Sequence, residues 1–232
     1  MNRERIVFVH GSGAFGAAAW GAQHGLALGY DALFLRRHGF DPEAEPLPTD
    51  FAEDARIVLE ALAGGGHLVA HAEGAIAAMM TAVEHPSLVH SLVLAEPACL
   101  SLTADLPATA AHRALLGPLY ARRGELGDEA FHREYSRLVF GGAAAPLDTP
   151  MARRAARRLR LQTPPWEAPL QIVPGVPTLV ITGGWEPLYE EVASYLSSTG
   201  ATLAVPGGGH RPQDTAAGDA LIRSFIAGHR HD

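Results

Sequence analysis

The chain has 232 residues, 47% of them hydrophobic, which is enough for the core of a single α/β domain. Its formal net charge of −7 argues against a nucleic-acid partner, and the absence of lysine excludes Schiff-base, pyridoxal-phosphate and P-loop chemistry, which each need a lysine amine. There is no apolar run of about 18 residues, no signal-peptide pattern and only one cysteine, Cys99, so we expect a cytoplasmic protein without a membrane partner.

Short apolar runs alternate with helical patterns along most of the chain. Six runs are expected to be strands: residues 5–10, 31–35, 67–74 (with the turn that follows the strand), 91–95, 177–182 and 201–205. Helices are expected up to residue 28, at 49–62, at 75–84, up to 198, and at 214–227. Strands that alternate with helices predict an α/β fold: a mostly parallel sheet of about six strands with helices on both faces.

The pattern changes between about Ser101 and Pro165, where apolar alternation stops and arginine-rich helical segments take over. We expect two or three helices inserted there as a small helical cap. The predicted organisation is therefore a core of residues 1–100 and 166–232, with the cap at 101–165 after the fourth strand. Active groups in such a sheet belong at the carboxyl ends of the strands.

The third strand ends in a turn of small residues, Ala70-His71-Ala72-Glu73-Gly74, and a helix follows at once. This is the small-x-nucleophile-x-small pattern of a nucleophile elbow, in which a sharp turn exposes a serine. Here the nucleophile position holds Ala72, and a methyl group cannot attack a substrate. The sequence therefore predicts the framework of a serine hydrolase without its serine.

Polar residues follow the other predicted strands, and their order resembles that of the α/β-hydrolase superfamily over nearly the whole chain. The matching positions are His10-Gly11-Ser12 after the first strand, the turn at Ala72, Glu96, Glu186 and His210. The resemblance implies that His210 is the general base, which three preceding glycines allow to point back over the sheet. It also implies that an acid orients His210: Glu186 is preferred, and Glu96 is the alternative.

In this family two backbone N–H groups form the oxyanion hole, which here would be those of Ser12 and Glu73. Trp185, Trp20 and Gly11 are expected to line the substrate site, with core packing as the equal alternative for Trp20. The implied partner is a small, largely apolar ester, thioester, amide or lactone, with no cofactor. No metal is expected, because the histidines near the strand ends lack a helical ligand pair. The sequence predicts no oligomeric state.

Three interpretations of Ala72 remain open: an engineered inactive hydrolase, a natural cofactor-free enzyme that uses His210 as base for elimination, cyclisation or isomerisation, and a binding protein without activity. Glu73 could serve as an acid or base if its side chain turns inward.

A different class of function is suggested by Gly11-Ser12-Gly13-Ala14-Phe15-Gly16, a literal G-x-G-x-x-G after a strand, with Arg36-Arg37 placed to meet the 2′-phosphate of NADP. The glycine-rich segment that follows it is a poor helix, which weighs against a dinucleotide site.

Overall fold

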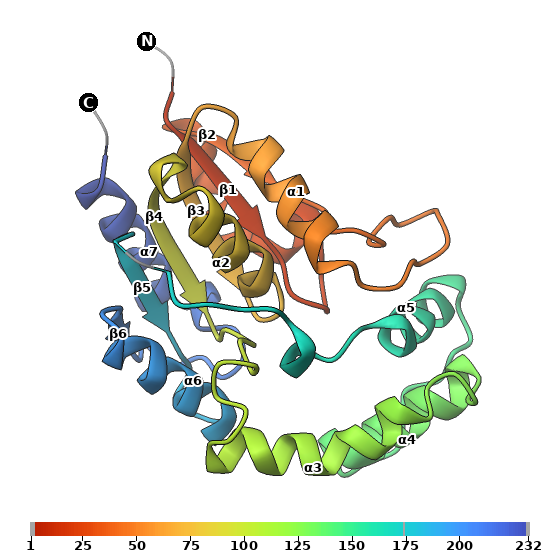
Figure 1. Cartoon of the computed structure of the whole chain (residues 1–232). Helices are drawn as coiled ribbons and strands as arrows, with labels where there is room; N and C mark the ends of the chain where they lie inside the picture. Colours follow the sequence, from red (N-terminus) through yellow and green to blue (C-terminus); the bar gives the residue numbers. More distant parts are fainter. Residues whose placement is uncertain (1–2, 174, 231–232) are drawn as a thin grey trace.

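A computed structural model describes residues 3–173 and 175–230 (Figure 1). Its centre is a six-stranded parallel sheet with the strand order β2-β1-β3-β4-β5-β6. The strands are β1 (Arg5–Val9), β2 (Asp31–Phe34), β3 (Gly66–His71), β4 (Val89–Ala95), β5 (Thr178–Ile181) and β6 (Thr202–Ala204). The predicted α/β fold with about six parallel strands is confirmed.

Helices cover both faces of the sheet because successive residues of each strand point to opposite sides. The α-helices outside the segment between β4 and β5 are α1 (Phe51–Leu62), α2 (Gly74–Glu84), α6 (Pro187–Ser198) and α7 (Ala216–Gly228). Helices α1, α2 and α6 pack on the face that presents Val7 and Val9. The other face, with Ile6 and Phe8, is covered by α7 and by the 3-10 helix η1 (Gly16–Leu28).

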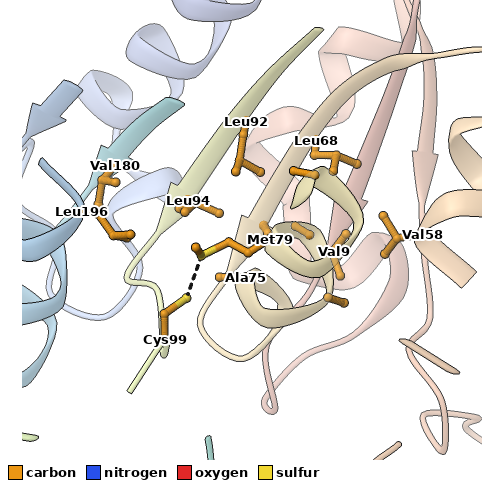
Figure 2. Packing of buried hydrophobic residues seen from close by; sticks show 14 of the residues in the cluster. Val9, Val58, Leu68, Ala75, Met79, Leu92, Leu94, Cys99, Val180 and Leu196 are labelled. Atoms are coloured by element: carbon orange, nitrogen blue, oxygen red, sulfur yellow. Dashed lines mark hydrogen bonds between the residues drawn. The ribbon is translucent and has the colours of Figure 1, made fainter. Parts of the chain in front are cut away.

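Helix α2 lies unusually close to β1, and glycine makes this possible. A Cβ on Gly74 would lie 2.5 Å from the carbonyl oxygens of Val9 and His10, which is too near for any side chain. The following turns of α2 bury small residues and Met79 against the central strands (Figure 2). This packing fixes the start of α2, and with it the turn at residue 72.

Three helices lie between β4 and β5: α3 (Pro107–Ala121), α4 (Asp128–Phe140) and α5 (Pro150–Leu161). We call them the insertion helices. Figure 1 shows them beyond the carboxyl ends of the strands. They have a small core of their own around Leu116 and Phe131. Several hydrogen bonds dock them on the sheet domain: for example, Glu191 of α6 accepts from the N–H groups of Ala108 and Thr109 at 2.8 Å each, and Arg158 donates to the carbonyl of Gly39 at 3.3 Å.

Within residues 3–173 and 175–230, every helix is too short or too polar to span a bilayer.

Candidate active site

The turn after β3 keeps the geometry of a nucleophile elbow although residue 72 is alanine. Ala72 has a φ of 49°, in the left-handed region that costs a non-glycine residue about 1–2 kcal/mol. The β4 end holds it there: the Ala72 N–H donates to the carbonyl of Ala95 at 3.0 Å, and its own carbonyl accepts from the N–H of Ala98 at 3.1 Å. The methyl group is 1% exposed, so the position is enclosed.

The loop after β1 lies directly against this turn. A Cβ on Gly11 would be 2.9 Å from the Ala72 Cβ, so only glycine fits there. Among the described residues, the N–H groups of Ser12 and Glu73 donate to no protein acceptor. The Glu73 N–H lies at the N-terminus of α2, where the helix dipole favours a negative charge. Two unsatisfied donors beside the nucleophile position are what an oxyanion hole requires.

The carboxylate nearest to His210 belongs to Glu96, which directly follows β4. Glu96 is 0% exposed, and its Oε2 lies 3.6 Å from the Nδ1 of His210. The same carboxylate accepts from the N–H of Gly183 at 2.6 Å and from the indole Nε1–H of Trp185 at 3.0 Å. These two donors fix the orientation of the carboxylate and replace the hydrogen bonds to water that it loses on burial.

His210 is carried by a loop that only glycine can build. Gly207, Gly208 and Gly209 have φ values of 80°, 95° and 59°. A Cβ on Gly183 would be 2.0 Å from the carbonyl oxygen of Gly209, so the loops after β5 and β6 pack backbone to backbone. The His210 side chain remains 41% exposed and can meet a substrate.

Glu186, the acid preferred from the sequence, does not contact His210. It is the N-cap residue of α6, its side chain makes no capping hydrogen bond, and it forms no ion pair among the described residues. The neighbouring Glu190 holds this loop instead, accepting from the hydroxyl of Thr182 at 3.0 Å and from the N–H of Gly184 at 3.1 Å. The geometry therefore favours Glu96 over Glu186 as the partner of His210: the carboxylate of Glu96 lies beside the imidazole, whereas Glu186 begins α6 and forms no ion pair with His210 among the described residues.

The two tryptophans predicted to line the site lie in different environments. Trp185 is 51% exposed, with its ring 6.1 Å from that of His210. Trp20 is fully buried against Phe8 in the core, so the alternative of core packing is the correct one. Tyr189, which the sequence analysis missed, lies with its ring 5.1 Å from His210; its place one turn into the helix after β5 was the available signal.

Glu73 turns toward the site, as the sequence analysis considered. Its Oε2 lies 3.3 Å from the position of a Cβ on Gly11. Burial and the negative charge of Glu73 raise the pKa of Tyr135 to about 12, and they also raise the pKa values of Tyr120 and Tyr189. Because Tyr120 and Tyr135 belong to α3 and α4, the carboxylate of Glu73 faces the underside of the insertion helices.

His71 is a second site histidine that the sequence analysis did not assign. Burial and the nearby His210 lower the pKa of His71 to about 3, so its ring is neutral. Its Nε2 donates to the carbonyl oxygen of His210 at 2.8 Å. His71 and His210 share a pocket of about 600 Å³ with Arg211, Asp214 and small residues of the loop after β1 and of η1.

The dinucleotide alternative does not fit this geometry. The segment after Gly16 is a 3-10 helix interrupted at Trp20, in place of the α-helix that opens directly after the glycines in a dinucleotide-binding motif. Arg37 is buried and pairs with Asp54 at 3.3 Å. Among the described residues, the three ligand atoms close enough to share a metal ion belong to Glu4, His67 and His90, at the other end of the strands.

Comparison with known proteins agrees with this arrangement. A family model described as the alpha/beta hydrolase family matches residues 6–223. Similar solved structures include MenH from S. aureus (TM-score 0.67, 16% identity, covering 100% of this chain and 96% of that one). A structure from a study of carboxylesterases of the thaumarchaeon Nitrososphaera gargenis (0.63, 16%, 97% and 90%) and one of a hydrolase from Pseudomonas aeruginosa PA01 (0.59, 18%, 97% and 90%) are also similar. No curated protein matches the chain at the sequence level.

Proposed function

Because the chain belongs to the alpha/beta hydrolase family, we propose that it is an enzyme of this fold in which His210, supported by Glu96, is the general base for a small, largely apolar carbonyl compound. The observation that carries the proposal is the 3.6 Å contact between His210 and buried Glu96, beside an elbow whose nucleophile position is Ala72. The substrate class is an ester, thioester, amide or lactone, and the insertion helices act as its cap.

The proposed chemistry follows from a site that has a general base and two N–H donors but no nucleophile. With Nδ1 directed at Glu96, the Nε2 of His210 is left to take a proton from the substrate, and the carboxylate stabilises the imidazolium that forms. The N–H groups of Ser12 and Glu73 would bind the carbonyl oxygen as its negative charge develops. No covalent intermediate can form at Ala72. The reaction that these groups support is therefore proton abstraction next to the carbonyl, followed by return of the proton or loss of a leaving group.

Restoring the nucleophile tests whether the site is that of a hydrolase. In Ala72→Ser, a fluorophosphonate probe should label the protein and a short-chain nitrophenyl ester should be turned over, whereas the chain with Ala72 should do neither. The control Ala72→Ser/His210→Asn should lose both, because the serine then has no base. A folded Ala72→Ser that neither reacts with the probe nor turns over the ester would overturn the hydrolase-type site.

The proton-abstraction step is tested in the chain as it stands. A panel of short-chain thioesters and lactones is incubated with the protein in deuterated water, and deuterium incorporation next to the carbonyl is followed by NMR. We expect exchange that His210→Asn abolishes. Exchange that persists in His210→Asn would exclude His210 as the base and leave Glu73 to be tested in its place.

A further inference from the structure

The starts of the central strands bring together three metal-binding side chains at the end of the sheet opposite to the candidate active site. Glu4 directly precedes β1, His67 belongs to β3 and His90 to β4. The Oε1 of Glu4 lies 3.1 Å from the Nε2 of His67 and 3.1 Å from the Nδ1 of His90. All three ligand atoms lie within 4.8 Å of one another.

His67 is placed as a metal ligand rather than as a surface residue. Its side chain is fully buried, and its Nδ1 lies 2.8 Å from the hydroxyl of Ser91. When Nδ1–H donates to this hydroxyl, the lone pair of Nε2 faces Glu4 and His90. The Nε2 atom is buried and makes no hydrogen bond of acceptable geometry. A ring nitrogen held in this way by a hydrogen bond to the other nitrogen is the usual arrangement of a histidine that binds a metal.

The spacing fits a tetrahedral ion. Zinc binds nitrogen and carboxylate oxygen at about 2.0–2.2 Å, so two of its ligands lie roughly 3.4 Å apart. The two observed separations of 3.1 Å need only a small opening to reach this value. Two imidazoles and one carboxylate form a ligand set that zinc prefers over magnesium or calcium, which require oxygen ligands.

The cluster is accessible to an ion. A pocket of about 910 Å³ is lined by Glu4 and His90, together with Gly64 and Gly65. A Cβ on Gly65 would lie 3.0 Å from the Nε2 of His90, so the glycine keeps this side of the ring open. The pocket leaves room for water or another ligand to complete the coordination.

We propose that Glu4, His67 and His90 form a binding site for a zinc-class divalent cation, which ties together the starts of β1, β3 and β4. The five residue steps from His67 to Ala72 extend about 16 Å at the rise of a β-strand, so the ion would not reach a substrate at the other end. Its role is to stabilise the sheet. The expectation that the chain has no metal site considered His10, His71 and His210; the three residues of this cluster come from separate strands, and only the parallel pairing of these strands brings them together.

Zinc titration of the untagged full chain, freed of metal with a chelator, tests the site by calorimetry. We expect one equivalent to bind with a dissociation constant in the micromolar range or tighter, and the melting temperature to rise with zinc. Glu4→Gln, which keeps the size of the side chain, and His67→Asn should each weaken binding at least tenfold and abolish the rise in melting temperature. Cobalt, added in place of zinc, should give the absorption of a tetrahedral site.

The control is His24→Asn, which removes an exposed histidine that is not part of the cluster and should leave the affinity unchanged; it is needed because the chain has 12 histidines. If His67→Asn does not fold, Glu4→Gln and His90→Asn decide the question. Equal zinc affinity in these variants and in the unaltered chain would assign binding to other histidines and overturn the proposal. The absence of zinc binding would also overturn the proposal, and the three side chains would then form only a histidine–carboxylate hydrogen-bond network.

Discussion

The Oε2 of Glu96 lies 3.6 Å from the Nδ1 of His210, and Glu96 reaches this position from a backbone with a φ of 46°. A non-glycine residue in the left-handed region is uncommon, and such residues cluster at functional sites. Ala72 shares this conformation at the end of the adjacent strand. Both residues that define the site are thus held in strained turns at the carboxyl ends of β3 and β4.

This contact predicts which acid supports His210. In the Ala72→Ser background, Glu96→Gln should lower ester turnover by roughly 10⁴-fold, the size of the effect when the buried aspartate of a serine protease becomes asparagine. Glu186→Gln should stay within about threefold, since Glu186 does not contact the imidazole. Steady-state kinetics with a nitrophenyl ester measure both, and circular dichroism verifies folding. A larger loss in Glu186→Gln than in Glu96→Gln would reverse the assignment.

The close approach of α2 to β1 predicts a large effect of a single methyl group. Gly74→Ala would place a Cβ 2.5 Å from two carbonyl oxygens, so the helix must shift. Overpacking of this kind typically costs about 1–3 kcal/mol, and we expect the upper end because the neighbours are backbone. Urea denaturation gives the free energy of unfolding. Gly64→Ala is the matched control, because a Cβ there meets nothing within 4 Å; a similar loss in both variants would refute the packing argument.

Cys99 should be inert toward thiol reagents in the folded protein. Burial raises the pKa of its thiol, and its Sγ lies 3.3 Å from the Sδ of Met79 in the core (Figure 2). The thiolate is the reactive form, so little of it exists at neutral pH. An aromatic disulfide reagent should react over hours with the native chain and within seconds in guanidinium chloride. Rapid reaction without denaturant would show that Cys99 is accessible.

The order of elements could be predicted from the sequence because each strand is a short apolar run and each turn carries glycine or proline. The elbow and the loop before His210 were also visible, since both depend on small residues at fixed positions. The choice between Glu96 and Glu186 was not, because both follow a strand and only the direction of the chain after the strand separates them. Trp20 was ambiguous for a related reason: a large aromatic residue in a glycine-rich segment has the same sequence signature in a pocket and in a core.

Contacts between segments that are far apart in the sequence could not be predicted from it. The tyrosines around Glu73 come from α3, α4 and α6, and no local pattern indicates that they converge. Arg158 belongs to one of the arginine-rich helical segments, yet it is buried, with its guanidinium 4.8 Å from the ring centre of Phe40. Helical spacing identifies which residues share a face but not what that face meets.

Two buried histidines predict how stability depends on pH. Burial lowers the pKa of His10 and of His71 to about 3, with Arg37 contributing for His10 and His210 for His71. His10 also has a fixed tautomer: its Nδ1 donates to the Gly11 carbonyl at 2.6 Å, while its Nε2 accepts from the Arg37 N–H at 3.1 Å. A second proton on this ring would break the latter bond.

In the unfolded chain both histidines titrate near their ordinary pKa of about 6.5. Below that pH the unfolded state therefore binds protons that the folded state does not bind. The contribution of these two histidines to the free energy of unfolding is therefore largest above pH 6.5. It decreases as the pH drops toward 3, by up to about 1.4 kcal/mol per pH unit for each histidine. Between pH 6.5 and 5, where few carboxylates have been protonated, the two together should cost about 3 kcal/mol. Urea denaturation across this range should show a slope that His71→Asn reduces by roughly a third, because burial also lowers the pKa of His67, to about 4. His24→Asn, which alters an exposed residue, should leave the slope unchanged. An unchanged slope in His71→Asn would mean that this ring takes up its proton equally in the folded and unfolded states, and would contradict the lowered pKa of His71.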